Sequence, residues 1–352
     1  MTAAKAHDEK PTVGFFDRGN ASYIQSDLDL LRSNCLISRS SFVARKPWSL
    51  PLAWFKQFVE CIRIIPSSTV VFVHFAGWNS VIPLILSRLF NKRSVLFLHG
   101  TDSVHLPTIG YGNFGKWPLA LATCHSVHSA RTIVAVDGSL IASENQYVQG
   151  QQGVMHFCKD LKTPSQVIPH GFDPERWPLG TGHRDIDVLT VGLELHQNWR
   201  RQLKGVDLLL DVARRMPRRR FMIICTGAHA IPDLPGNVTA LGQVSLSQLV
   251  QWYQRAVVYA QMSMSEGFGC ALAEAMLCGC IPVVSAVGAM PRIIGATGVV
   301  VRKRDAIELE HAIGSMLARK SINASHMARE QITKNYSLRI RSEALSRLVN
   351  ST

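Results

Sequence analysis

The sequence predicts an α/β protein made of two domains, each a parallel sheet covered by helices. Short apolar runs that end in glycine or turn residues alternate with helical patterns along the chain, as parallel strands joined by helices require. The 352 residues are enough for two domains of ordinary size, each with its own core. Proline and glycine gather at residues 174–182, which gives that segment the composition of a linker.

The first half of the chain contains short apolar runs that predict strands. They span residues 12–16, 70–74, 95–98 and 133–136. Apolar residues spaced three and four apart predict helices between them, at about residues 21–33, 50–65 and 79–89 and from Ser139 onward. In an open parallel sheet, ligands collect beyond the carboxyl ends of the strands, so the loops after these strands are candidate site segments.

The second half repeats the pattern. Predicted strands span residues 187–192 and 221–225, then a run that ends at Gln261, then residues 281–284. Predicted helices span residues 206–215, 246–256 and 270–277, and two more follow Asp305. This second alternation of strand and helix predicts a second parallel sheet.

Residues 263–284 place two carboxylates around a glycine loop at the start of a helix. Gly267 and Gly269 form the loop, and the free N–H groups and dipole of the helix that follows favour an anion such as phosphate. Glu266 lies in the loop, where it can meet sugar hydroxyls, and Glu274 lies two turns later, within reach of a ribose. The alternative is that Glu266 only interacts with the helix dipole, worth ~0.3–1 kcal/mol, and that Glu274 is merely exposed.

The same stretch resembles the Glu-x7-Glu signature of retaining GT-B glycosyltransferases, in particular glycosyltransferase family 4. The matching residues are Ser263, Glu266, Gly267, Phe268, Gly269, Glu274, Ala275, Met276, Gly279, Pro282, Val283 and Val284. The resemblance implies a GT-B fold, with two Rossmann-like domains facing each other across a cleft. It divides the chain into an acceptor-side domain at 1–172 and a nucleotide-sugar-binding domain at 180–335, with a last helix at about 337–352 packed back on the first.

The resemblance also implies which second-domain residues hold the donor. The loop residues Gly267, Phe268 and Gly269 and the carboxylate of Glu274 belong to this set. Lys204 matches a lysine of the family that binds the donor phosphates.

The family's usual phosphate-binding arginine is missing. Leu193 occupies its position, which leaves Arg200 or Arg201, in the insert that follows, as replacements. Either side chain could supply the positive charge that a departing diphosphate requires.

Two first-domain residues are candidates for the same site. His99 opens a His-Gly-x-Asp sequence that resembles the family segment lining the cleft near the donor sugar, and a histidine at a strand end often faces a ligand. Gly19 follows the first strand, where relatives have a glycine loop, although an ordinary turn glycine is an equal alternative. The chain departs from the family at His170, where asparagine is usual, and at Arg292, where glutamate is usual.

The implied reaction moves a sugar, with retention of anomeric configuration, from a UDP- or GDP-sugar to a hydroxyl of a glycan or lipid-linked acceptor. Glu266 orients the sugar, and Glu266 and His99 are the catalytic candidates. No cofactor and no metal are expected, because the Asp-x-Asp sequences at 27–29 and 185–187 lie in a helix and at a strand start. The alternatives are a GT-B sugar-nucleotide 2-epimerase and an inactive nucleotide-sugar-binding scaffold.

The formal net charge of +13 favours an anionic partner. No zinc-finger spacing or other nucleic-acid-binding motif is present, which argues against nucleic acid. The helix at 50–65, with Arg45, Lys46 and Trp48 before it, could touch an anionic membrane surface, as expected for polysaccharide or glycolipid synthesis, or could simply pack on the sheet. The arginine run at 214–220 has the same two interpretations, membrane contact or solvated surface.

The location predicted from the sequence is the cytoplasm, either free or peripherally attached to the inner face of a membrane. The N-terminus lacks the apolar core of a signal peptide, and no stretch of about 18 apolar residues would span a bilayer. The eight cysteines show no metal-ligand spacing, and most are expected to be reduced core residues.

Overall fold

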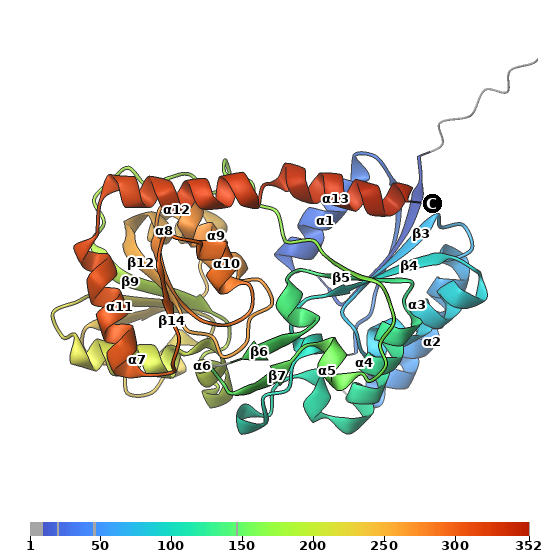
Figure 1. Ribbon diagram of the computed structural model, residues 1–352, viewed down its shortest axis with the longest axis horizontal. Helices are drawn as coiled ribbons and strands as arrows, with labels where there is room; N and C mark the ends of the chain where they lie inside the picture. Colours follow the sequence, from blue (N-terminus) through green and yellow to red (C-terminus); the bar gives the residue numbers. More distant parts are fainter. Residues whose placement is uncertain (1–9, 20, 45–46, 146, 352) are drawn as a thin grey trace, which may run out of the picture.

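The computed structural model describes residues 10–19, 21–44, 47–145 and 147–351, which fold into two α/β halves side by side (Figure 1). The first half is a parallel sheet with strand order β2-β1-β3-β4-β5-β8. Its strands are β1 (Thr12–Asp17), β2 (Leu36–Ser41), β3 (Val70–His74), β4 (Arg93–Leu98), β5 (Thr132–Ala135) and β8 (Ser165–Val167). Its helices are α1 (Ser22–Arg32), α2 (Leu50–Ile64), α3 (Trp78–Leu89), α4 (Trp117–Ser129) and the single turn α5 (Val154–Phe157).

The second half is also a parallel sheet, with strand order β11-β10-β9-β12-β13-β14. Its strands are β9 (Ile186–Gly192), β10 (Phe221–Cys225), β11 (Val238–Leu241), β12 (Ala256–Gln261), β13 (Ile281–Ser285) and β14 (Val299–Val301). Its helices are α6 (Asn198–Lys204), α7 (Val206–Arg215), α8 (Leu246–Arg255), α9 (Cys270–Leu277), α10 (Met290–Ile294), α11 (Ala306–Ala318) and α12 (Ile322–Asn335).

The strand β3 shows why these runs are apolar at every position. Val70 and Phe72 point into a core shared with α1 and the last helix, whereas Val71 and Val73 point into the core under α2, α3 and α4. A parallel strand covered by helices on both faces buries every side chain, so it carries no polar alternation. The predicted α/β fold class with two Rossmann-like parallel sheets is confirmed.

Two C-terminal helices connect the halves. The helices α12 and α13 (Leu338–Asn350) run nearly end to end along one side of both sheets (Figure 1). The backbone of Phe172, in the segment that links the halves, forms two hydrogen bonds with the junction between these helices. It donates to Tyr336 O at 2.8 Å and accepts from Leu338 N at 3.2 Å. The helix α13 therefore leaves the second half at this crossing and packs against α1 of the first.

A buried ion pair anchors α13. The guanidinium of Arg341 donates to both carboxylate oxygens of Asp27 on α1, at 2.9 and 2.7 Å, and the two side chains are 1% and 3% exposed. The same guanidinium donates to the carbonyls of Ile168 and Pro169 at 2.6 and 3.2 Å. One side chain thus joins the last helix, the first helix and the segment that links the halves.

The chain between β5 and β8 differs from the sequence prediction. The prediction of a helix from Ser139 is wrong, because Gly138–Leu140 forms only a 3₁₀ turn. The carboxylate of Asp137 caps this turn by accepting from Ser139 N at 2.9 Å. An antiparallel hairpin follows, β6 (Ser143–Asn145) with β7 (Gly150–Gln152). It reaches the second half, where Asn145 Nδ2 donates to Met264 O at 3.3 Å.

The cysteines are mostly reduced, with one exception. Cys124 on α4 and Cys158 after α5 form a disulfide, which tethers the hairpin region to α4. The other six are free, and all but the half-buried Cys270 are buried. In the part of the chain that the structure describes, every helix is too short or too polar to cross a bilayer.

Candidate functional site

Glu266 is held in place by three donors on one carboxylate oxygen. Its Oε2 accepts from Lys204 Nζ at 2.8 Å, Gln261 Nε2 at 2.7 Å and Ser263 Oγ at 3.2 Å. Gln261 ends β12 and Ser263 follows it, so the strand end fixes the carboxylate in one orientation. Among the described residues, no side chain donates to the other oxygen, Oε1, which can therefore interact with a ligand.

The glycine loop after Glu266 meets the first half of the molecule. A Cβ on Gly267 would lie 1.9 Å from His99 O, so only glycine allows this approach of the two halves. Gly269 has φ +104°, a conformation that favours glycine, and precedes α9. The N-terminal turn of α9 therefore faces the gap between the two sheets, with N–H groups available for an anion.

Three adjoining cavities lie between the halves. The central cavity, of about 380 Å³, is lined by residues from both sides, including Glu266, His99, Lys204, Arg200, Phe268 and Gly269. The hinge cavity, of about 290 Å³, contains Glu274 and Arg176 and shares Ser22, Tyr23, His170 and Cys270 with it. The outer cavity, of about 730 Å³, contains Gly267 and shares His99, Lys204 and Glu266 with the central one.

Lys204 is the cation nearest to the carboxylate in the central cavity. Burial lowers the pKa of Lys204, but the carboxylate of Glu266 outweighs this effect, and the net shift is upward. The ammonium therefore stays charged at neutral pH, where it can exchange part of its contact with Glu266 for an anionic ligand.

Of the two candidate arginines, only Arg200 lines the cavities. Its guanidinium pairs with Glu194 at 2.6 Å and lies 4.6 Å from the centre of the Trp199 ring. Arg201 turns back onto its own loop, donating to Leu195 O at 3.1 Å and His196 O at 2.9 Å. The insert folds as α6, and its helical turn separates these two neighbouring side chains.

His99 and His170, with Ser22 and Tyr23 of α1, form the first-half wall of the central cavity, and the buried His74 lies behind His99. The ring of His99 lies between His74 and His170, with centroids 5.2 and 5.8 Å away, and Tyr23 stacks on it at 5.0 Å. Burial, with a contribution from the Arg341 charge, lowers the pKa of His99 to about 3, so its imidazole is neutral. His99 Nε2 bonds with His74 Nδ1 at 3.0 Å, whereas His99 Nδ1 has no partner among the described residues.

Glu274 lies in the hinge cavity rather than on the surface. Burial raises the pKa of Glu274 to about 8, although the charge of Arg176 acts in the opposite direction. The carboxyl is therefore largely protonated at neutral pH in this structure. It can either donate to or accept from a ligand hydroxyl.

The raised pKa of Glu274 predicts a pH-dependent stability. Because the folded protein binds this proton more tightly than the unfolded chain, stability falls as the pH rises from about 4.5 to about 8 and then levels off. The free energy of unfolding of the wild type, relative to Glu274→Gln, should fall by at most about 1.4 kcal/mol per pH unit in this window. Urea unfolding at pH 6, 7, 8 and 9 checks this, with Glu330→Gln, an exposed site on α12, as control. A constant difference would contradict it.

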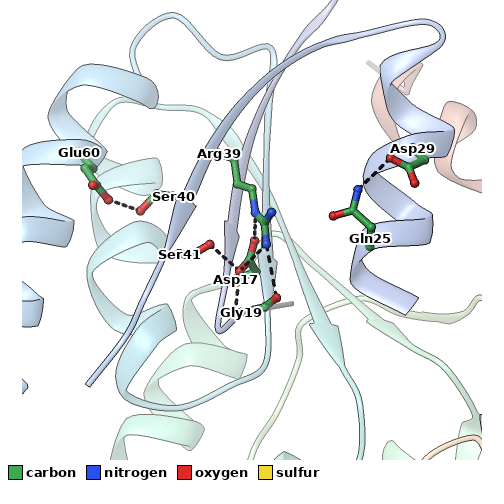
Figure 2. Close-up of polar contacts among 8 residues, drawn as sticks. All are labelled: Asp17, Gly19, Gln25, Asp29, Arg39, Ser40, Ser41 and Glu60. Atoms are coloured by element: carbon green, nitrogen blue, oxygen red, sulfur yellow. Dashed lines mark hydrogen bonds and ion pairs between the residues drawn. The ribbon is translucent and has the colours of Figure 1, made fainter. Parts of the chain in front are cut away.

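Gly19 does not join these residues. It has φ +129°, and its N–H donates to Asp17 Oδ1 at 2.8 Å. Figure 2 shows that the same carboxylate also accepts from Ser41 Oγ, at 2.8 Å, and Arg39 Nε, at 2.7 Å, which ties the loop after β1 to β2. Within the described residues, the cavities are lined at this point by Ser22 and Tyr23 of α1 instead.

A bidentate ion pair crosses between the halves at Arg292. Its Nε donates to Asp137 Oδ2 at 2.8 Å, and its Nη2 contacts Asp137 Oδ1. Asp137 is buried just beyond the end of β5, and Arg292 lies within α10 immediately after Pro291, where the family usually has glutamate. The departure from the family pattern therefore supplies a contact between the two halves.

Replacing Arg292 with alanine is expected to favour opening of the cleft. Because Arg292 is 59% exposed, we expect a modest effect. A ligand that contacts both halves should bind roughly two- to fivefold more weakly. Solution scattering should give a larger radius of gyration than for the wild type. The control is Arg255→Ala, which removes an equally bidentate pair with Asp185 inside the second half. Equal radii for the two variants would contradict a role in closure.

Several residues that line the cavities were not predicted from the sequence. Tyr23, Gln261 and Arg176 have no distinctive motif around them, and only folding brings them to the cavities. His170 was visible as an unusual residue of the linking segment, but its ring stacking was not. Among the described residues, no group of three or more histidine, cysteine or carboxylate side chains could hold a metal ion.

The sequence matches a known family over part of its length. Residues 187–319 match the model of glycosyl transferases group 1. D-inositol 3-phosphate glycosyltransferase of Mycobacterium sp. (strain KMS) is 28% identical over 253 residues, which are 60% of this chain and 56% of that protein. The gpi3 subunit of phosphatidylinositol N-acetylglucosaminyltransferase of Schizosaccharomyces pombe is 28% identical over 242 residues, 61% of this chain and 50% of that protein. The chain thus spans about half the length of these curated relatives.

Solved structures resemble the whole chain. Sucrose-phosphate synthase from Thermosynechococcus elongatus superposes with a TM-score of 0.71 at 15% identity, covering 96% of this chain and 98% of that one. Anabaena Alr3699/HepE, in complex with UDP and glucose, superposes with a TM-score of 0.69 at 14% identity, covering 97% and 99%. The chain therefore has the GT-B fold, its residues 187–319 match the glycosyl transferases group 1 model, and the resemblance to glycosyltransferase family 4 is confirmed.

Proposed function

We propose that this chain is a retaining glycosyltransferase that uses a nucleoside diphosphate sugar as donor. The single observation that carries the proposal is the Glu266 carboxylate, held by Lys204, Gln261 and Ser263 beside the N-terminus of α9 and facing His99 across the cleft. An inactive scaffold has no need for a carboxylate and a lysine fixed in this way.

The hinge cavity and the central cavity together match the parts of such a donor. The hinge cavity, with Glu274, takes the nucleoside, and the first turn of α9 and Lys204 take the diphosphate. The sugar then lies between Glu266 and His99, which line the same cavity. HepE was solved with UDP and glucose, which supports UDP among the donor nucleotides, and GDP is the alternative.

The reaction balances without a covalent enzyme intermediate. The bond from the anomeric carbon to the diphosphate oxygen breaks, and the acceptor oxygen bonds to the same face of that carbon. Because the new bond forms on the face that the diphosphate leaves, configuration is retained, and the acceptor proton passes to a phosphate oxygen. Lys204 and the helix N-terminus stabilise the charge that develops on the diphosphate, and Glu266 stabilises the positive charge on the sugar ring.

Neutralisation of the diphosphate is assigned to protein groups, and no metal or cofactor is part of the proposal. Lys204 supplies a full charge, α9 supplies N–H groups, and Arg200 lines the same cavity. The contribution of Arg200 requires it to exchange its pairing with Glu194.

We place the protein in the cytoplasm, docked peripherally on an anionic membrane. One face of α2 packs against α3 and the core of the first half, where Gln57 Nε2 donates to Asn79 O at 2.7 Å and Cys61 is buried. On the other face, Leu52 and Phe55 are 72% and 66% exposed. The exposed Arg63 lies on the same helix, whereas Arg45 and Lys46 lie outside the described residues. This combination suits an interfacial helix and a lipid-linked acceptor.

Replacing Phe55 with serine should reduce co-sedimentation of the protein with phosphatidylglycerol vesicles, because it removes an exposed apolar side chain from α2. Equal binding of the wild-type protein to uncharged phosphatidylcholine vesicles would contradict the charge argument.

The experiment that tests the enzymatic proposal is a donor screen. Release of UDP or GDP from a panel of nucleotide-sugars is measured without acceptor for the wild type and for Glu266→Ala. Slow hydrolysis of one donor, lost in the variant, is expected. If no donor is turned over and none raises the thermal stability, the proposed function is contradicted, whereas a donor that raises the thermal stability without being turned over would indicate an inactive nucleotide-sugar-binding scaffold.

A further inference from the structure

The outer cavity is the largest of the three, and the donor does not account for it. Its volume of about 730 Å³ falls within the range of small-molecule sites, about 300–1,000 Å³. It begins where the central cavity ends, since His99, Lys204 and Glu266 line both. Whatever occupies it therefore lies next to the groups assigned to the donor sugar.

An aromatic wall made by both halves closes this cavity. Tyr111 belongs to the first half and Trp199, on α6, to the second, and their rings lie 6.2 Å apart with an angle of 29° between their planes. At this distance the two rings leave no room for a third ring between them. They form one continuous surface that is complete only while the two halves are in contact.

The polar atoms of this wall are already bonded, so it offers apolar surface. The indole N–H of Trp199 donates to Gln197 Oε1 at 2.9 Å, and the hydroxyl of Tyr111 bonds with Thr101 Oγ1 at 2.9 Å. The guanidinium of Arg200 covers the Trp199 ring at 4.6 Å, which fixes the ring in place. A rigid apolar ring surface loses little conformational entropy when a ligand packs on it.

The remaining lining is polar, and this combination specifies a class of ligand. Ser265, Lys116 and the carboxylate of Glu266 supply hydrogen-bonding groups around the aromatic wall. A pyranose ring has an apolar C–H face and a rim of hydroxyls, and it needs both kinds of surface. A purely lipid or peptide ligand would not use both.

We propose that the outer cavity is the acceptor site and that it binds a pyranose ring of the acceptor against Tyr111 and Trp199. The inference rests on the proposed glycosyltransferase activity and adds the substrate class at the acceptor side. A hydroxyl of the bound ring points toward Glu266 and the anomeric carbon of the donor. Because the wall spans both halves, the acceptor site is complete only when the cleft is closed.

The test measures nucleotide release from the donor that the wild type hydrolyses, with and without acceptor. The acceptor probes are the methyl pyranosides of glucose, galactose, mannose and N-acetylglucosamine, compared with glycerol and glycerol phosphate, which have no ring. The variants are Trp199→Ala, Tyr111→Ala and Trp199→Phe. The matched control is Trp252→Ala on α8, because Trp252 also lies under an arginine, Arg255 at 4.5 Å, but outside the three cavities.

A pyranoside should stimulate release by the wild type, and its KM should rise about tenfold in both alanine variants. The change should fall on the pyranoside KM much more than on the donor KM, Trp199→Phe should restore most of the affinity, and Trp252→Ala should match the wild type. An unchanged pyranoside KM in Trp199→Ala, or stimulation by the ring-less acceptors alone, would overturn the inference while leaving the donor reaction intact. Absence of any donor turnover in the wild type is a different result, because it removes the proposed activity and this inference with it.

Discussion

Replacing Lys204 with methionine is expected to lower donor turnover by about 10²- to 10³-fold. The ammonium is the full positive charge closest to Glu266, at 2.8 Å, and the departing diphosphate needs such a charge in a site sheltered from water. Glu266 would still accept from Gln261 and Ser263, so the loop should keep its shape. The loss should therefore appear in kcat with little change in thermal stability.

Two further variants separate charge from geometry at this position. Lys204→Arg keeps the charge and should retain more activity than Lys204→Met. Lys334→Met, at an exposed position of α12, controls for the loss of one positive charge elsewhere. Activity of Lys204→Met within a factor of three of the wild type would show that other groups neutralise the leaving diphosphate.

Replacing Arg341 with methionine should lower the free energy of unfolding by about 3–5 kcal/mol. The substitution leaves the carboxylate of Asp27 buried without its partner. The carbonyl groups of Ile168 and Pro169 also lose the hydrogen bonds that Arg341 donates to them. Urea unfolding followed by fluorescence measures the effect.

The same helix provides the matched control. Arg339 pairs with Glu343 at 3.3 Å, but both side chains are exposed, so Arg339→Met should cost less than about 1 kcal/mol. The double variant Asp27→Leu with Arg341→Met removes both charges and should recover part of the loss. Equal stability of Arg339→Met and Arg341→Met would contradict the assigned role of the buried pair.

The sequence was most informative where local rules and burial coincide. The helix predicted at 270–277 is the observed α9, and the strands β1, β3, β4, β5, β9, β10, β12 and β13 lie within a residue or two of the apolar runs that predicted them. These runs are buried on both faces, so their composition alone identifies them. The strands at the outer positions of the two sheets, β2, β8, β11 and β14, were not predicted. The glycines of the 263–284 stretch were also correctly predicted to form a tight loop. Gly267 lies where the backbone of the other half approaches closely, and Gly269 has a positive φ.

The rest depends on contacts between distant segments, which no local pattern encodes. The sequence of the insert after Leu193 did not predict that it would fold as α6 and bring Trp199 next to Tyr111. It also did not predict which of the two arginines would line the cavity. Gly19 looked like a site glycine, but Asp17 draws its backbone N–H toward β2. The pairing of Asp137 with Arg292 joins positions 155 residues apart and was visible only as an unusual arginine.

The measurement that most directly tests the central claim is time-resolved proton NMR of a single nucleotide-sugar incubated with the wild-type protein. The account predicts release of the nucleoside diphosphate together with a sugar that first appears in the anomeric configuration of the donor, before mutarotation. A sugar that first appears with inverted configuration would contradict the retaining mechanism. Absence of release from every UDP- and GDP-sugar would contradict the assignment of the cleft to glycosyl transfer.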